Sequence, residues 1–291
     1  MSVRAVTGAV LPRAAEAASP ERVAAALDLL DRRPLVVLTG AGLSTDSGIP
    51  DYRGPGAPTR MPMTYQEFVG SHEARQHYWA RSHVGWSRMG RAEPNRGHLA
   101  VAALDADLVI TQNVDGLHER AGTPRLVALH GRIADVVCLA CGTVSPRADL
   151  QERLGDLNPD WLARHVAAAV RPDGDVDLSA EDTSTFVVPA CACGGVLKPD
   201  VVFFGETVPL DRVTPCLAAV DALAETDGAL LVVGSSLAVM SGLRFVRRAA
   251  KAGVPVVIAN RGQTRGDDLA DVAVETDCAT FLESLIGRRA G

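Results

Sequence analysis

The sequence predicts an α/β protein built on a doubly wound parallel sheet, with a smaller module inserted into it. Short apolar runs of strand length alternate with amphipathic segments of helix length, a pattern typical of an open parallel sheet. Two close pairs of cysteines interrupt the alternation near the middle of the chain. The 291 residues, 47% of them apolar, suffice for one large and one small domain.

Residues 1–18 lack the continuous apolar stretch of a secretory signal, and we expect them to form a flexible N-terminus. The first helix is predicted to begin at Ser19-Pro20-Glu21, because a capping hydroxyl, a proline at the first helical position and an acid in the first turn favour a helix start. Without a secretory signal, the cysteines are interpreted as cytosolic thiols, so we expect a cytoplasmic protein.

The first predicted strand, residues 35–38, is followed by Gly40-Ala41-Gly42. Glycine has no Cβ to keep a ligand away, and the N–H groups of such a turn can hold a diphosphate. The third glycine of the dinucleotide fingerprint G-x-G-x-x-G falls on Thr45, so this segment alone fits a nucleotide site and a tight turn equally well. Residues 47–54 add a proline, an acid, an aromatic ring and an arginine, which indicates a functional loop.

Residues 55–95 are predicted to form short helices that cover this loop, as an insertion between the first and second strands. A helix at 98–104 and strands at 108–110 and 126–129 follow, and polar, glycine-bearing segments come directly after both strands, at 111–118 and 130–131. Ligands of an open parallel sheet bind at the carboxyl ends of its strands. The strands at 35–38, 108–110 and 126–129 all end in polar or glycine-bearing segments, so together they predict a single ligand-binding crevice.

The alternation resumes in the last third of the chain. Strands are predicted at 201–204, 229–233, 254–259 and 272–274, and helices at 210–224, 242–252 and 279–286. We therefore assign residues 19–132 and 200–291 to the large domain and residues 133–199 to the small module.

The small module contains the four closely spaced cysteines, Cys138, Cys141, Cys191 and Cys193, and a glycine follows each pair. Four thiolates fit a closed, tetrahedral site for one structural zinc ion, so we expect a zinc-ribbon and helical module. The second pair is C-x-C and the pairs lie further apart than usual, which leaves buried, unliganded cysteines as the alternative. A redox dithiol is disfavoured because the first pair lacks a thioredoxin-like setting.

Taken together, these segments resemble the sirtuins, the NAD-dependent protein-lysine deacylases. The resemblance runs from about residue 35 to about residue 285, and its motifs occur in family order: residues 40–54, 111–118, 129–131, the four cysteines, 198–206 and 233–236. Tyr52 and residues 75–81, 150–153, 158–161 and 172–176 resemble the class II branch. The fold implied by this resemblance is a Rossmann-like NAD-binding domain with a small zinc module.

The resemblance also implies a reaction, in which the acyl group of an acyl-lysine is transferred to the ADP-ribose of NAD and nicotinamide is released. It implies that His130 is the general base, a task suited to imidazole near neutral pH, and that Asn113 and Asp115 orient the ribose. The implied NAD-binding residues are Gly40, Ala41, Gly42, Ser44, Ile49, Pro50, Asp51, Tyr52, Arg53, Gln112, Asn113, Val114, Asp115, Gly234, Ser235, Ser236, Asn260, Arg261, Gly262 and Cys278. An acyl-lysine protein or peptide is expected to add as a strand along Val202, Phe203, Phe204, Gly205 and Leu237.

Two other functions stay open at this point. A protein mono-ADP-ribosyltransferase would use the same NAD pocket, and a non-catalytic module would bind NAD or zinc only to interact with partners. A hydride-transferring dehydrogenase is disfavoured, because the dinucleotide fingerprint is incomplete.

Charge and hydropathy exclude further classes. The formal net charge of −6 gives no broad basic surface for nucleic acid or an anionic membrane. No apolar run approaches the ~20 residues that a membrane-spanning helix needs. The Tyr-x-x-Arg pair that marks negatively charged acyl substrates in related desuccinylases is not evident between Arg53 and Phe68, so neutral acyl groups are expected to be preferred over succinyl.

Overall fold

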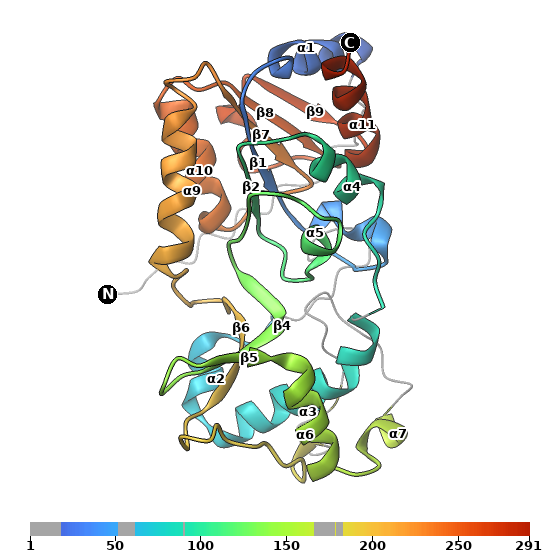
Figure 1. Ribbon diagram of the computed structural model, residues 1–291, viewed down its shortest axis with the longest axis vertical. Helices are drawn as coiled ribbons and strands as arrows, with labels where there is room; N and C mark the ends of the chain where they lie inside the picture. The colour runs from blue at the N-terminus through green and yellow to red at the C-terminus, as the bar shows by residue number, and fades with distance from the viewer. Residues whose placement is uncertain (1–18, 52–61, 90, 166–177, 179–182) are drawn as a thin grey trace, which may run out of the picture.

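Figure 1 shows the computed structural model of the chain, which describes residues 19–51, 62–89, 91–165, 178 and 183–291. The expected parallel sheet has six strands in the order β3-β2-β1-β7-β8-β9, and every neighbouring pair is parallel. The strands are β1 (Leu35–Thr39), β2 (Leu108–Thr111), β3 (Leu126–Ala128), β7 (Ala229–Val233), β8 (Val256–Asn260) and β9 (Val272–Glu275). The predicted flexible segment 1–18 lies outside the described residues.

Helices cover both faces of this sheet, which confirms the doubly wound α/β fold (Figure 1). All residues of β1, β7 and β8 are buried, and alternate side chains enter two separate cores, as Val37 and Val36 do. Helices α1 (Pro20–Leu30), α4 (Arg96–Ala103) and α11 (Cys278–Arg289) pack on one core, and α9 (Leu210–Ala222) and α10 (Met240–Lys251) on the other. Continuous apolar strands require this cover on both sides.

A second, smaller unit lies beyond the end of the parallel sheet (Figure 1). Its antiparallel sheet has the order β5-β4-β6, made of β4 (Gly131–Cys138), β5 (Val144–Pro146) and β6 (Leu197–Val201). Its helices are α2 (Tyr65–Gly70), α3 (His72–Met89), α6 (Arg147–Leu157) and α7 (Trp161–His165). Phe68 and Trp79 share one core with Val136 and Leu154, so helices predicted as a cover of the first loop pack on the second sheet.

The strand predicted at 201–204 is wrong, because the chain forms β6 at Leu197–Val201 and pairs it with β4. The apolar run 201–204 has the pattern of a buried parallel strand. The strand that forms contains Lys198 and Pro199, and a charge and a proline are unusual inside a buried strand, so it was not predicted. After Val201 the chain leaves the sheet, and the carbonyl of Phe204 accepts a hydrogen bond from the N–H of Tyr65 at 2.9 Å.

The strand order reverses beside β1, which lies between β2 and β7. A doubly wound sheet binds its ligands outside the carboxyl ends of the strands at such a point. The short helices η1 (Ala41–Leu43), η2 (Thr45–Ser47) and α5 (Leu117–Arg120) follow β1 and β2 at this edge. Among the described residues, no helix has the length and apolar character needed to cross a membrane.

Candidate active site

A cavity of about 1610 Å³ opens at the carboxyl edge of the parallel sheet, and residues of the second unit line its other side. The general base candidate His130 lines it, together with every predicted NAD-binding residue that the structure describes: Gly40, Ala41, Gly42, Ser44, Ile49, Pro50, Asp51, Gln112, Asn113, Val114, Asp115, Gly234, Ser235, Ser236, Asn260, Arg261, Gly262 and Cys278. The predicted peptide residues Val202, Phe203, Phe204, Gly205 and Leu237 line the same cavity. Tyr52 and Arg53 lie outside the described residues.

The glycines after β1 pack tightly against the glycine after β7. The N–H of Gly42 donates to the carbonyl of Gly234 at 2.8 Å, and a Cβ on Gly42 would lie 2.9 Å from that oxygen. Gly234 has a φ of 62°, and a Cβ there would lie 2.5 Å from the backbone nitrogen of Leu43. These positions therefore require glycine because the two loops touch, and their contact forms one floor for the cavity.

A hydrogen-bond network fixes the polar side chains at the ends of β1 and β2. Asn113 Nδ2 donates to the Gly40 carbonyl at 3.1 Å and to Ser44 Oγ at 2.9 Å. Ser44 Oγ donates to Asp115 Oδ2 at 2.7 Å, and the other oxygen of Asp115 accepts from the N–H of Leu117 at 2.9 Å. Ser44 is buried, whereas Asn113 and Asp115 are half-buried in the cavity wall. The network therefore presents a fixed amide and a fixed carboxylate to the cavity.

Two buried histidines lie behind this network and support it. His98 places Nε2 3.3 Å from Ser44 Oγ, and His118 places Nε2 2.9 Å from Thr39 Oγ1. The two rings contact each other edge to face, with centroids 5.0 Å apart. Burial lowers the pKa of His98, and it lowers the pKa of His118 to about 3. Both rings are therefore neutral, structural groups.

The ring of His130 is held at both nitrogens. Nδ1 lies 2.8 Å from the carbonyl of Gln112, and Nε2 lies 2.7 Å from Ser241 Oγ. A carbonyl only accepts, so Nδ1 carries the proton and Nε2 accepts from the serine hydroxyl. Burial lowers the pKa of His130; the hydrogen bond to Gln112 opposes this, and the charges of Arg212 and Arg244 add to it. The ring is therefore neutral near pH 7, with its lone pair on Nε2.

The segment after β6 forms the wall next to His130. The N–H of Val202 donates to the His130 carbonyl at 2.8 Å. Lys198, only 3% exposed, places Nζ 3.0 Å from Glu206 Oε2, and the same oxygen accepts from the N–H of Phe203 at 2.8 Å. Burial lowers the pKa of Lys198, and the charge of Glu206 opposes this shift. Because a buried ammonium needs its partner, this ion pair fixes the loop between Val202 and Glu206.

The last four of the predicted NAD-binding residues meet at the end of β8 and the start of α11: Asn260, Arg261, Gly262 and Cys278. Asn260 Nδ2 donates to the carbonyls of Arg261 and Gly262 at 3.0 and 2.9 Å, which closes the loop on itself. The guanidinium of Arg261 pairs with Asp277, the N-cap residue of α11. Burial raises the pKa of Cys278 to about 12, so this thiol stays neutral.

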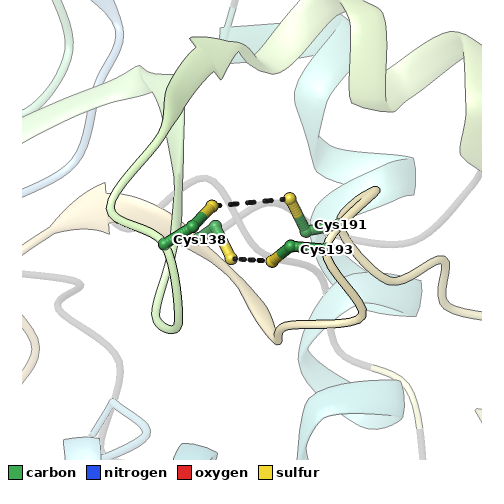
Figure 2. A group of neighbouring side chains, drawn as sticks. Cys138, Cys191 and Cys193 are labelled. Carbon is green, nitrogen blue, oxygen red and sulfur yellow. Dashed lines mark hydrogen bonds between the residues drawn. The ribbon is translucent and has the colours of Figure 1, made fainter.

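The four cysteines of the second unit converge between β4 and the loop before β6. Their sulfur atoms lie within 4.8 Å of one another, with Cys138 3.5 Å from Cys193 and Cys141 3.9 Å from Cys191 (Figure 2). A tetrahedron with Zn–S bonds of about 2.3 Å has S–S edges of about 3.8 Å, which matches these distances. A Cβ on Gly195 would lie 2.6 Å from Cys138 Sγ, so the glycine makes room for the sulfurs. The four cysteines are positioned to bind one zinc ion.

The backbone around the sulfurs favours metal binding. The register of the second sheet sets Cys138 opposite Leu197, and the N–H of Leu139 donates to the carbonyl of Val196 at 2.9 Å. Hydrogen bonds from the backbone N–H groups of Cys141 and Ala140 lower the pKa of Cys138. They stabilise the thiolate, which is the form that binds zinc.

The cavity also contains residues that the sequence analysis did not single out. Ser241 and Arg244 line it from the first turns of α10, and Glu206 lines it from the loop after β6. Glu206 stood inside a family motif, but no role was assigned to it. For Ser241 and Arg244 the only signal was their i,i+3 spacing, which puts both on one helix face and which many surface helices share.

Comparisons with known proteins agree with this architecture. A family model described as the Sir2 family matches residues 40–241. NAD-dependent protein deacetylase 1 of Streptomyces coelicolor is 53% identical over 90% of this chain and 88% of its own length, and NAD-dependent protein deacetylase 1 of Mycobacterium avium is 52% identical over 92% and 95%. A solved structure of Sir2 with a p53 peptide and NAD+ matches 91% of this chain and 97% of its own, at 28% identity and a TM-score of 0.71.

Proposed function

The chain belongs to the Sir2 family, and we propose that it is an NAD-dependent protein-lysine deacetylase that works in the cavity at the carboxyl edge of the parallel sheet. It transfers the acyl group of an acyl-lysine to the ADP-ribose of NAD and releases nicotinamide. One observation carries the proposal: the neutral ring of His130 lines a single cavity together with the glycine-bearing loops and the segment after β6.

The cavity suits a dinucleotide and a substrate side chain together. Its volume of about 1610 Å³ exceeds the roughly 300–1,000 Å³ of pockets for drug-sized ligands. The loops at 40–42 and 234–236 would hold the diphosphate, and the residues at 260–262 with Cys278 would hold the adenosine. The residues at 49–51 and 112–115 would surround the nicotinamide and its ribose. When bound, NAD supplies the ribose to which the acyl group is transferred.

The side chains around His130 have distinct tasks in this proposal. His130 Nε2 takes a proton from a ribose hydroxyl, which replaces Ser241 Oγ at that nitrogen when the substrate binds. The bond from Nδ1 to the Gln112 carbonyl keeps the ring in the required tautomer. Asn113 and Asp115 orient the ribose, since Ser44 holds both of them in place. Water is excluded by Ile49, which is 8% exposed.

The peptide is proposed to bind as an added strand along residues 202–205 and Leu237. This mode binds the peptide through backbone hydrogen bonds, which are the same for every residue type. The side chains that flank the acylated lysine therefore contribute less to specificity than the acylated lysine itself. The ion pair of Lys198 with Glu206 supports the mode, because it fixes the loop on which the strand would lie.

The zinc ion has a structural task in this proposal, since four thiolates leave no open coordination position. Residues 19–132 and 200–291 are proposed to supply the NAD-binding domain and residues 133–199 the zinc module, on which helices α2 and α3 of the first range pack. A cytoplasmic location completes the proposal, because reduced thiols are stable there.

The test combines the protein with NAD and an acetyl-lysine peptide and identifies the products by mass. Free nicotinamide, deacetylated peptide and O-acetyl-ADP-ribose in equal amounts are the expected result. Protein-bound ADP-ribose without deacetylated peptide would indicate the mono-ADP-ribosyltransferase instead. No loss of NAD with any acyl peptide would leave only a binding module.

A further inference from the structure

Arg244 is a half-buried cation in the cavity wall. Its side chain forms no hydrogen bond or ion pair with the part of the chain that the structure describes. It follows Ser241 by three positions on α10, so both side chains lie on the same helix face. Ser241 contacts His130 Nε2 at 2.7 Å, and the charge of Arg244 contributes to the low pKa of His130. The guanidinium therefore acts close to the reacting end of the substrate.

The positive charge of Arg244 has no counterpart at the start of α10. Val239, the N-cap residue, gives no side-chain cap, and the first turn contains no acid, so the positive end of the helix dipole adds to the charge. The acids among the described residues that line the cavity are already engaged: Glu206 pairs with Lys198, Asp115 accepts from Ser44, and Asp51 has a partner of its own. An anion that enters with the substrate would therefore meet an uncompensated cation.

We propose that Arg244 binds a carboxylate of the acylated peptide, either at the far end of the acyl chain or on a residue that flanks the modified lysine. This inference rests on the proposed deacylase function. A guanidinium presents parallel N–H groups that match both oxygens of a carboxylate. The diphosphate of NAD is the competing anion, but the proposed function assigns it to the glycine-bearing loops.

The inference departs from the expectation that neutral acyl groups are preferred over succinyl. That expectation rested on residues between Arg53 and Phe68, where no Tyr-x-x-Arg pair occurs. Arg244 reaches the cavity from α10, a different element, so the absence of that pair does not remove the cation from the substrate site.

The test compares Arg244→Met with Arg247→Met. Methionine keeps much of the side-chain length and removes the charge. Arg247 is an exposed arginine of the same helix that does not line the cavity, so it is the matched control. One peptide sequence is prepared in three forms, with acetyl-, succinyl- or glutaryl-lysine. Two further peptides carry acetyl-lysine and differ only in the residue beside it, which is Glu in one and Gln in the other. The kcat/KM is measured for each peptide, and the KM for NAD is measured with each variant.

The expected result is a fall of about tenfold or more in the succinyl-to-acetyl or glutaryl-to-acetyl ratio for Arg244→Met, and an unchanged ratio for Arg247→Met. A fall in the Glu-to-Gln ratio alone would place the carboxylate on the flanking residue. Both ratios unchanged would overturn the inference, and so would a change confined to the KM for NAD. If the wild-type protein turns over no peptide, the proposed function fails; binding of fluorescent glutaryl- and acetyl-lysine peptides to the same variants then tests Arg244 separately.

Discussion

Ser241 Oγ lies 2.7 Å from Nε2 of His130, although the two residues come from distant parts of the chain. His130 follows β3, whereas Ser241 is in the first turn of α10. With Nδ1 bound to the Gln112 carbonyl, the serine completes a two-point support of the ring. We regard Ser241 as a positioning residue, because it acts on the reaction through His130.

Valine and threonine at position 241 have nearly the same shape and differ in the hydroxyl. We expect Ser241→Val to lower kcat by about tenfold relative to Ser241→Thr, with the KM for NAD nearly equal, because only threonine retains the bond to His130. Steady-state kinetics of the two variants measure this difference. Equal kcat values, with equal thermal unfolding, would show that the hydroxyl has no part in placing the ring.

Replacing the base itself gives a larger effect. We expect His130→Ala to lower deacetylation by about 100-fold or more, because no other group takes the ribose proton. Zinc content and the Tm should stay near wild type, since the backbone bond between Val202 and residue 130 does not need the side chain. His72→Ala, at an exposed histidine, is the control. Activity that persists in His130→Ala would require another base.

The low pKa of His130 predicts the shape of the pH–rate profile. Protonation of Nε2 removes the lone pair, and burial moves this protonation below the ordinary histidine value of about 6.5. Deacetylation should therefore keep more than half of its maximal rate at about pH 6.5, and it should fall to half only at lower pH. A profile of kcat/KM that already falls by half at about pH 7 would contradict the neutral, buried ring.

Loss of zinc should affect the substrate site as well as stability. The cysteine cluster holds the loop before β6 against β4, and β6 leads directly into the peptide segment. We expect Cys141→Ser to lower bound zinc, to lower the Tm and to raise the KM for the peptide more than that for NAD. Cys216→Ala, at a buried thiol in α9, should keep about one zinc ion per chain. Full peptide affinity in zinc-depleted protein would contradict this coupling.

The buried His118 should make the fold less stable in acid. Its pKa is about 3 in the native protein and about 6.5 when unfolded, so between these values only the unfolded state binds the proton. The free energy of unfolding should therefore decrease as the pH falls below 6.5, by up to about 1.4 kcal/mol per pH unit for this group. Urea unfolding of wild type and His118→Gln at about pH 7 and about pH 4.5 measures the difference. A variant with the same pH dependence as wild type would exclude this histidine as a cause.

The parallel sheet was predictable because its strands carry the signal locally. The run 229–233 coincides with β7, since a strand that is buried on both faces is apolar at every position. The same rule failed at 201–204, where apolar residues follow the strand. The strand that forms contains Lys198. Its charge is paired with Glu206 in the folded protein, and the sequence alone does not show this ion pair.

The candidate site was predictable where glycine or a motif marks it. The loop at 40–42 follows a strand, and its glycines are required by contact with Gly234, which is itself a motif position. The partner of His130 on α10 could not be found in this way. Ser241 reaches His130 only because the fold brings the start of α10 beside the segment that follows β3, and a serine in a first helical turn carries no such information.

The chain passes from one sheet to the other on either side of the base. β4 begins at Gly131, directly after His130, and β6 ends at Val201, directly before the segment that bonds to the His130 carbonyl. Gln112 and Ser241 hold the ring of His130 to the large domain, so tilting of the small unit would pivot at the base. Such a tilt would move the docking strand over the dinucleotide floor while the proton acceptor keeps its place.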